Sequence, residues 1–330
     1  LFKAIRYLVS QGKTVLFITH KLKEVLEISD VVTVMRNGQI SGEINTKDAT
    51  ETLLTNMMVG REVMLTIDKK ITDHKKDVLK VSGLNVRDDR QILRVKNASF
   101  TLKEGEILGI VGVSGNGQNE LVEAITGLRS WENGEVLLDD EPLTCGSIRN
   151  RRLHQIGYVP QDRIRYGSSR DSSLVENCIM GYHLQHLRKK KFLMDYNAAA
   201  SFTKDIVSNY KVKAGSIQDR AGSLSGGNLQ KLIVGREFSQ NNKVLVIEDP
   251  TRGIDVGAIE YIHKQIVAER DKGRAVLLVS LELDEVMNLS DRILVIYEGE
   301  IVGEFDPKKT TVEELGLYMA GAKKQGEAKA

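Results

Sequence analysis

A glycine-rich stretch between an apolar run and a helical pattern is the first place where this 330-residue sequence suggests chemistry. Successive backbone N–H groups in such a loop, together with the positive end of the following helix, bind phosphate. Glycines allow backbone conformations that side chains would block. The apolar run covers residues 107–111 and the helical pattern covers 120–125. The loop reads Gly112, Val113, Ser114, Gly115, Asn116, Gly117, Gln118 and Asn119.

Two positions of this loop depart from what a working phosphate-binding loop needs. Such a loop ends in a Lys that reaches the outer phosphates and a Ser or Thr whose hydroxyl binds magnesium. Gln118 and Asn119 stand at these positions. We therefore expect a backbone cradle that lacks its cation and its metal-binding hydroxyl.

A second candidate anion site precedes a predicted helix start at Lys231. Serine and glycine pairs at such a place offer backbone N–H groups and a hydroxyl to an anion. The residues concerned are Leu224, Ser225, Gly226, Gly227, Asn228 and Gln230.

Polar side chains also follow two predicted buried strands. The apolar run 243–247 ends in Glu248 and Asp249, and carboxylates at such a strand end hold magnesium and orient a water molecule. Gln161 stands at the end of the other stretch, residues 156–161, which predicts a strand that leads into a loop.

An ungapped internal repeat organises the chain. Residues 12–43 match residues 273–304 at a constant offset, which indicates duplication. Each copy predicts a strand, a helix, a second strand, a glycine turn and a short strand. His20 follows the first strand of one copy, and Leu281 holds the same position in the other. Only the second copy has a long body before this ending, so we expect roughly 180 further residues to belong before the first.

The repeat and the composition predict the domain organisation. We expect the end of a first domain over residues 1–62, beginning with a helix, and a polar linker over 63–77. A second domain over 78–319 would precede a disordered tail over 320–330. Within the second domain, residues 78–81 and 98–102 predict antiparallel strands, and residues 173–214 predict a polar helical region.

The net charge and the hydropathy of the chain argue against nucleic-acid binding and against a membrane-spanning helix. The net charge of +2 gives no reason to expect nucleic acid, and no apolar run approaches the ~18 residues that a membrane-spanning helix needs. The basic run 188–191 is open to two interpretations, a solvated helix face or a site for nucleic acid or lipid, and we favour the first.

The order of these motifs resembles that of the ABC-type ATPases. The sequence Leu-Ser-Gly-Gly-Asn-Leu-Gln at 224–230 is the most specific signal, and residues 158–163 and 250–258 look like those of ATP-binding subunits of simple-sugar and nucleoside importers. The resemblance covers nearly the whole chain. It implies an α/β P-loop NTPase fold in tandem, each copy a mixed sheet with an antiparallel β-subdomain and a helical subdomain. It also implies ATP and Mg²⁺ as cofactors.

The resemblance also implies roles for single residues. It assigns catalytic positions to His20, Glu248, Asp249 and Gln161. It assigns contacts with Mg²⁺ to Glu248 and Gln161. It also implies that Asp255 binds nucleotide together with the loop and signature residues. Glu248 and Asp249 exchange the usual Asp and Glu, and Leu281 replaces a histidine. Together with Gln118 and Asn119, these departures argue against turnover at this site.

In the ABC ATPases each site is shared between two halves that pair. The retained His20 and signature 224–230 belong to one composite site, which we expect to be the hydrolytic one. The implied partners are an integral membrane permease and, through it, an extracytoplasmic solute-binding protein, with the ATPase on the cytoplasmic face of the membrane. Two alternatives stay open: a soluble tandem ABC protein acting on ribosomes or DNA, and a non-hydrolysing regulatory scaffold.

Overall fold

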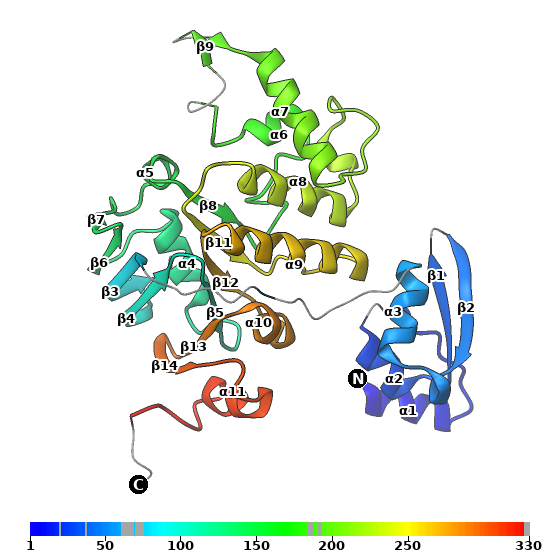
Figure 1. Ribbon diagram of the computed structural model, residues 1–330. Helices are drawn as coiled ribbons and strands as arrows, with labels where there is room; N and C mark the ends of the chain where they lie inside the picture. The colour runs from blue at the N-terminus through cyan, green and yellow to red at the C-terminus, as the bar shows by residue number, and fades with distance from the viewer. Residues whose placement is uncertain are drawn as a thin grey trace. The chain divides into compact units, whose positions relative to one another are not determined.

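A computed structural model of the chain describes residues 1–19, 21–36, 38–60, 69, 76–183, 188–190 and 193–326 (Figure 1). The chain divides into two compact units. One comprises Leu1–Thr66 with Ile254–Tyr261, and the other comprises Ile67–Gly253 with Ile262–Ala330. The break after Thr66 falls within the predicted linker, most of which lies outside the described residues.

The first unit is small and has few buried side chains. Its β-strands form an antiparallel pair, and Val34 and Leu54 are its buried hydrophobic residues among those described before residue 61. Its elements are α1 (Phe2–Ser10), α2 (Leu22–Ile28), β1 (Val31–Arg36), β2 (Gln39–Asn45), a 3₁₀ turn (Thr46–Asp48) and α3 (Glu51–Val59). The start of α9 (Val256–Asp271) is grouped with them.

The predicted strand near the start of the chain is wrong. Residues 13–19 adopt no regular structure, and Leu16 and Ile18 are each 89% exposed. The equivalent apolar run of the second copy is β12 (Ala275–Val279), which is hydrogen-bonded to a parallel strand on each side. A strand needs such neighbours for its backbone groups, and no described strand of the first unit pairs with residues 13–19.

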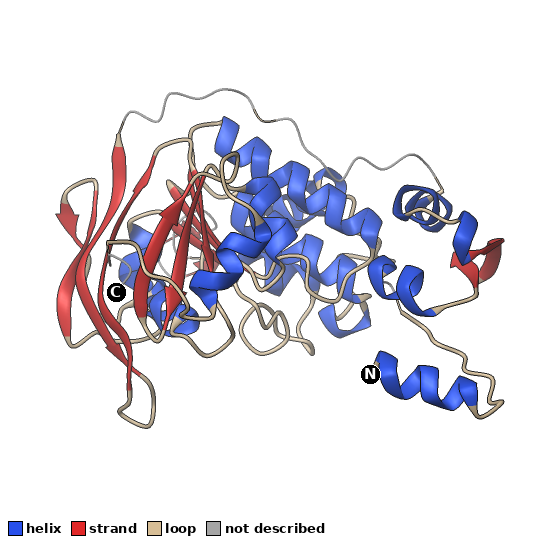
Figure 2. Cartoon of the chain, turned by 90° about the horizontal axis from the view of Figure 1, so that it is seen from below, coloured by secondary structure: helices blue, strands red, loops and turns tan. Residues whose placement is uncertain are grey.

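The second unit contains two main sheets. A six-stranded sheet has the order β14-β13-β5-β12-β11-β8, parallel except for the edge pair β13–β14, and a four-stranded antiparallel sheet has the order β4-β3-β6-β7. Figure 2 shows the long antiparallel strands beside the shorter strands of the larger sheet. The strands are β3 (Asp77–Arg87), β4 (Leu93–Lys103), β5 (Ile107–Val111), β6 (Asn133–Leu138), β7 (Glu141–Pro142), β8 (Ile156–Val159), β11 (Val244–Glu248), β12, β13 (Arg292–Tyr297) and β14 (Glu300–Phe305).

One apolar core joins the two sheets. Residues of both sheets and of α4 (Gln118–Thr126), such as Leu121 and Ile125, are fully buried in it. The central strands β5, β11 and β12 are buried along their whole length, as expected for parallel strands covered on both faces. These results confirm the predicted strands near residues 78, 98, 107, 156 and 243 and the helix after the glycine loop.

The helical region differs in part from the sequence prediction. Helices α6 (Leu174–Ile179) and α7 (Tyr196–Asn209) agree with it, but a short hairpin of β9 (Arg188–Lys190) and β10 (Leu193–Met194) separates them. Like charges three or four residues apart destabilise a helix, which opposes a continuous helix through the basic run. The remaining helices are α5 (Ile148–Leu153), a 3₁₀ turn (Ala221–Ser223), α8 (Gly226–Phe238), α9, α10 (Leu283–Leu289) and α11 (Val312–Met319).

The two copies of the internal repeat have matching local structure. Helices α2 and α10, strands β1 and β13, and helices α3 and α11 begin at equivalent positions. Threonine caps the last helix of each copy, Thr50 in α3 and Thr311 in α11. A β-bulge follows Val34 in one copy and Val295 in the other.

The end of the second unit is more ordered than the sequence suggests. The backbone N–H of Gln325 donates to the carbonyl of Val302, and its side-chain oxygen accepts the N–H of Glu304. The disorder expected from residue 320 therefore does not include Gln325. No helix in the part of the chain that the structure describes has the length and apolar character to cross a membrane.

Candidate functional site

The predicted site residues of the second unit meet at one edge of the six-stranded sheet. Strands β5, β12, β11 and β8 are adjacent and parallel, so their carboxyl ends lie side by side. The glycine loop follows β5, Leu281 follows β12, Asp249 follows β11 and Gln161 follows β8. Open parallel sheets bind their ligands at this edge.

The glycine loop has the backbone conformation of a phosphate cradle. Gly115 and Gly117 have φ values of 91° and 103°, a region that favours glycine. A Cβ on Gly117 would also lie 2.2 Å from the carbonyl oxygen of Arg94. Gly117 is the N-cap of α4, and within the described residues the N–H groups of Ser114, Gly115 and Gly117 donate to no protein acceptor. These donors are therefore free for an anion.

Asn116 fixes this loop to the turn between β13 and β14. Its side-chain oxygen accepts the N–H of Glu298 at 2.9 Å, and its carbonyl accepts the N–H of Gly299 at 3.1 Å. Its own N–H donates to the carbonyl of Val113. The conformation of the loop is thus stabilised by its own backbone and by a neighbouring turn.

The two substituted loop residues do not replace the missing groups. Gln118 is buried, 5% exposed, and its Nε2 donates to the carbonyl of Val113 at 3.2 Å inside the loop. Asn119 is exposed on the first turn of α4 and has an amide in place of a hydroxyl. The side-chain amide of Gln118 therefore hydrogen-bonds to the loop backbone, and it carries no positive charge.

The carboxylate of Glu248 accepts two hydrogen bonds from other residues of the chain. It is 6% exposed, and its Oε2 accepts a short hydrogen bond from the hydroxyl of Tyr158. The backbone N–H of Gln161 also donates to this carboxylate. Burial raises the pKa of Glu248 to about 7, against the effect of these two hydrogen bonds, and the nearby charge of Asp249 adds to the increase. Burial and Glu248 likewise raise the pKa of Tyr158.

The carboxylate of Asp249 also accepts two hydrogen bonds. Its Oδ2 accepts from Nε2 of Gln161 at 2.5 Å, and its Oδ1 accepts from the backbone N–H of Leu281 at 2.8 Å. The residue has a φ of 37°, which is uncommon for a non-glycine residue. A cavity of about 100 Å³ lies beside it, lined by Asp249, Thr251, Arg252, Ser280, Leu281 and Glu282.

The signature stretch forms the start of α8. The helix begins at Gly226, five residues before the predicted start at Lys231, because Ser225 caps it by accepting the N–H of Asn228. The Ser225 hydroxyl also accepts from the side-chain amide of Asn228 at 2.9 Å. Leu224 and Gly227 are half-buried, and Gln230 is buried.

Arg163 links the signature to the loop after β11. Its Nη1 donates to the carbonyl of Arg252 at 2.7 Å, and its Nη2 donates to that of Gly253 at 3.4 Å. A Cβ on Gly226 would lie 2.9 Å from the same Nη2, so the guanidinium lies against the first residue of α8. The sequence prediction included this arginine only as part of a motif.

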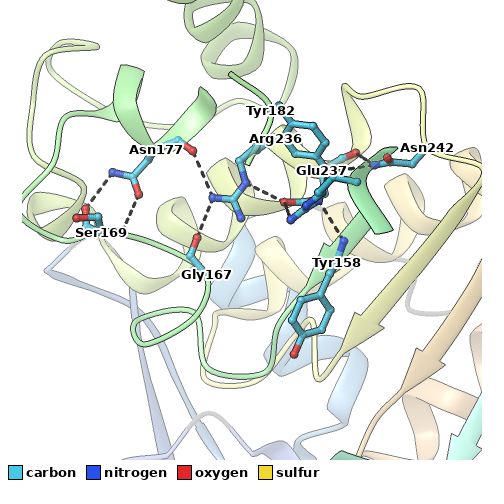
Figure 3. Close-up of polar contacts among 9 residues, drawn as sticks. Tyr158, Gly167, Ser169, Asn177, Tyr182, Arg236, Glu237 and Asn242 are labelled. Atoms are coloured by element: carbon cyan, nitrogen blue, oxygen red, sulfur yellow. Dashed lines mark hydrogen bonds and ion pairs between the residues drawn. The ribbon is translucent and has the colours of Figure 1, made fainter. Parts of the chain in front are cut away.

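A buried ionic network lies beneath these loops (Figure 3). The carboxylate of Glu237 is fully buried between Arg152, at 2.5 Å, and Arg236, at 2.9 Å, and accepts the Tyr182 hydroxyl. Burial opposes ionisation of Glu237, but the two arginines lower its pKa to about 2. Arg236 also donates to the carbonyl of Gly167 at 2.9 Å.

Tyr158 joins this network to the strand-end carboxylate. Its backbone N–H donates to Oε2 of Glu237 at 3.2 Å, and its hydroxyl donates to Glu248. Figure 3 shows its ring pointing away from Glu237. Sequence reasoning assigned no role to Tyr158 or Glu237. The signal it could have used is the pair Arg236 and Glu237, which stands between the apolar residues 232–234 and Phe238.

Two further predicted site residues are not among the described residues of the second unit. His20 is outside the described residues. Asp255 belongs to the first unit, where its Oδ1 accepts the N–H of Ala258 at 2.9 Å and caps the start of α9. This bond is a structural role for Asp255, and its predicted role in nucleotide binding remains a prediction.

The predicted Mg²⁺ ligands of this site also make hydrogen bonds within the protein. Mg²⁺ prefers octahedral oxygen ligands, usually one or two carboxylates with water and phosphate oxygens. Glu248 accepts from Tyr158, Gln161 donates to Asp249, and Asn119 offers no hydroxyl. The described residues contain no group of three or more His, Cys, Asp or Glu side chains that could hold a metal ion. The glycine loop thus fits a phosphate, and the predicted role of Gln161 and Glu248 in binding Mg²⁺ remains a prediction.

Comparison with known proteins agrees with this geometry. Residues 95–252 match the ABC transporter family model. A nucleotide-free ATP-binding cassette from an ABC transporter superposes with a TM-score of 0.61 at 20% identity, over 74% of this chain and 99% of that one. The second unit has the fold of an ABC ATPase. This fold is a P-loop NTPase with mixed α/β sheets, as the sequence predicted.

Two curated relatives extend the similarity over nearly the whole chain. A nucleoside import ATP-binding protein, NupA of Lactococcus lactis subsp. cremoris, is 40% identical over 97% of this chain and 63% of its own length. A glucose import ATP-binding protein, TsgD13 of Haloferax volcanii, is 42% identical over 97% of this chain and 59% of its own length. The chain therefore spans about 60% of the curated relatives that it matches.

Proposed function

We propose that this chain is part of the ATP-binding subunit of an ABC importer for nucleosides or simple sugars. The observation that carries the proposal is the convergence of four motif loops at one edge of a parallel sheet, with the signature capping α8. The names of NupA and TsgD13, which describe nucleoside and glucose import, support the solute class. ATP hydrolysis at the cytoplasmic face of the membrane would drive transport through an integral membrane permease.

Within this function, the second unit serves as the non-hydrolysing partner. Its glycine loop offers backbone donors without the lysine, and both strand-end carboxylates are engaged by the protein. It would bind nucleotide weakly and lend residues 224–230 to the site built on the first domain of the complete protein. His20 would act in that composite site, and ATP would hold the two halves together.

The first test concerns the shared site. In the complete protein, Ser225→Arg is expected to abolish ATP hydrolysis and solute uptake by permease-containing vesicles, because the signature can no longer approach phosphate. Ser223→Arg is the matched control, an exposed serine in the preceding turn. Full hydrolysis by Ser225→Arg would contradict the shared-site proposal.

The second test concerns the partner. Purification of the complete protein from membranes is expected to retain an integral membrane permease, and uptake assays with nucleosides and with ribose or glucose would identify the solute. Co-sedimentation with ribosomes in the absence of any membrane partner would instead support the soluble tandem ABC alternative.

A further inference from the structure

Strand β14 forms one edge of the six-stranded sheet, so one side of its backbone has no partner strand. It pairs with β13 on its inner side, and no other strand among the described residues pairs with it. Its residues Ile301, Val302 and Phe305 are of types that favour strands. An edge of this kind is a template for pairing with another extended chain, and native proteins protect such edges.

The chain that follows α11 turns back toward this edge. The N–H of Gly321 donates to the carbonyl of Tyr318, and the N–H of Ala322 donates to the carbonyl of Leu317. Gly321 has a φ of 72°, and a Cβ at this position would lie 2.3 Å from the ring of Tyr297 in β13. Glycine is therefore required where the chain turns over the end of β13.

Gln325 then bonds to β14 in the way that a neighbouring strand would. Its backbone N–H donates to the carbonyl of Val302 at 2.9 Å. Its side-chain oxygen accepts the N–H of Glu304 at 2.9 Å, and its Nε2 donates to the carbonyl of Glu304 at 2.9 Å. A glutamine side chain has a carbonyl oxygen and N–H donors, as a peptide group does, so it can bond both backbone groups of one residue. Val302 and Glu304 stand two residues apart, so these bonds lie along one side of the strand, away from β13.

Two further contacts place this segment on the strand. Lys324 pairs with Glu300 at 2.7 Å, although both side chains are partly exposed and water weakens the attraction. A Cβ on Gly303 would lie 3.3 Å from Cδ of Gln325, so the glutamine side chain lies directly against the strand backbone. Gln325 therefore covers β14 at the point where a neighbouring chain would pair.

We propose that residues 321–326 are a cover that prevents the outer edge of β14 from pairing with a second copy of this chain. The N–H of Glu304 has one proton to donate, so it cannot bond Gln325 and another strand at the same time. A second copy is the partner that fits, because it has an identical edge and two such edges can pair about a two-fold axis. The proposal concerns self-association and is independent of the proposed transport function.

Two shortened chains test this proposal. A chain that ends at Lys323 lacks the cover, whereas a chain that ends at Gly326 keeps it and is the matched control. Sedimentation equilibrium is expected to give a dissociation constant for self-association at least about tenfold lower for the chain ending at Lys323, because its free edge can form hydrogen bonds between copies. Equal dissociation constants for the two chains would overturn the proposal.

A proline substitution distinguishes edge pairing from general misfolding. Glu304→Pro in the chain ending at Lys323 removes the outward N–H, and an edge strand tolerates proline at such a position. We expect this variant to return the dissociation constant to within about twofold of the control chain. Association that persists in this variant would place the contact elsewhere, and the proposal would be wrong.

Hydrogen exchange of the Glu304 amide gives a second measurement. In dilute samples it is expected to be about tenfold faster in the chain ending at Lys323 than in the chain ending at Gly326, because the acceptor on Gln325 is gone. It should slow again as the concentration of the shorter chain rises. Exchange that does not depend on concentration would show that the freed edge binds no second copy.

Discussion

The side-chain amide of Gln161 lies 2.5 Å from the carboxylate of Asp249, and this bond joins the loop after β8 to the loop after β11. The other oxygen of Asp249 accepts the N–H of Leu281, which follows β12. One buried carboxylate thus connects the ends of three adjacent strands. These two hydrogen bonds hold the loops at this edge of the sheet together.

Removing the Gln161 amide should therefore destabilise the second unit. Gln161→Leu leaves an oxygen of Asp249 unpaired at a site where the residue is only 8% exposed, and such a loss costs about 1–3 kcal/mol. Urea unfolding followed by the fluorescence of Trp131, the single tryptophan, measures it. Gln218→Leu, at an exposed position, is expected to change the unfolding free energy by less than about 0.5 kcal/mol.

Arg163 should control the opening of the loop after β11. Its guanidinium binds the carbonyls of Arg252 and Gly253, so Arg163→Ala frees this segment from the start of α8. Hydrogen exchange of peptides covering residues 249–256 is expected to accelerate by about tenfold, because the local opening free energy falls by about one hydrogen bond to a charged donor. Arg165→Ala removes an exposed arginine that stacks on Tyr166, and it should leave this exchange unchanged.

Glu237 should be the most sensitive charged residue of the second unit. Glu237→Gln leaves Arg152 and Arg236 without their buried anion, and breaking such a pair costs about 3–5 kcal/mol. The same urea titration would detect this loss. Glu135→Gln, on an exposed part of β6, is the control and should unfold like the wild type. A loss below about 1 kcal/mol for Glu237→Gln would show that the network is relaxed by water.

Features that depend on neighbouring residues could be predicted from the sequence, whereas features that depend on residues far along the chain could not. The glycine loop was predictable because positive φ values and a helix N-terminus are local requirements, met by Gly115 and Gly117. The strand at β12 was also correct, but the same pattern around Leu16 forms no strand, because the pairing that decides it comes from elsewhere in the chain.

The parts that sequence reasoning missed depend on side chains brought together by folding. Nothing local indicates that Tyr158 bonds Glu248, or that Arg152 bonds Glu237. The start of α8 was a local signal that the prediction overlooked, since Ser225 before a glycine pair is a suitable N-cap. The predicted Mg²⁺ ligands were likewise chosen by position, whereas their hydrogen-bond partners are a tertiary property.

The raised pKa of Glu248 predicts a specific dependence of stability on pH. Its pKa is about 7 in the folded protein and ordinarily 4.5, so the folded state binds the proton more tightly. The unfolding free energy therefore falls as pH rises from about 4.5 through about 7, by at most about 3 kcal/mol. Glu248→Gln removes this penalty. It should be more stable than the wild type at pH 8, and the difference should shrink toward pH 5. Urea titrations at each pH, with the exposed Glu141→Gln as control, measure the difference. A difference that does not change with pH would mean that Glu248 titrates normally.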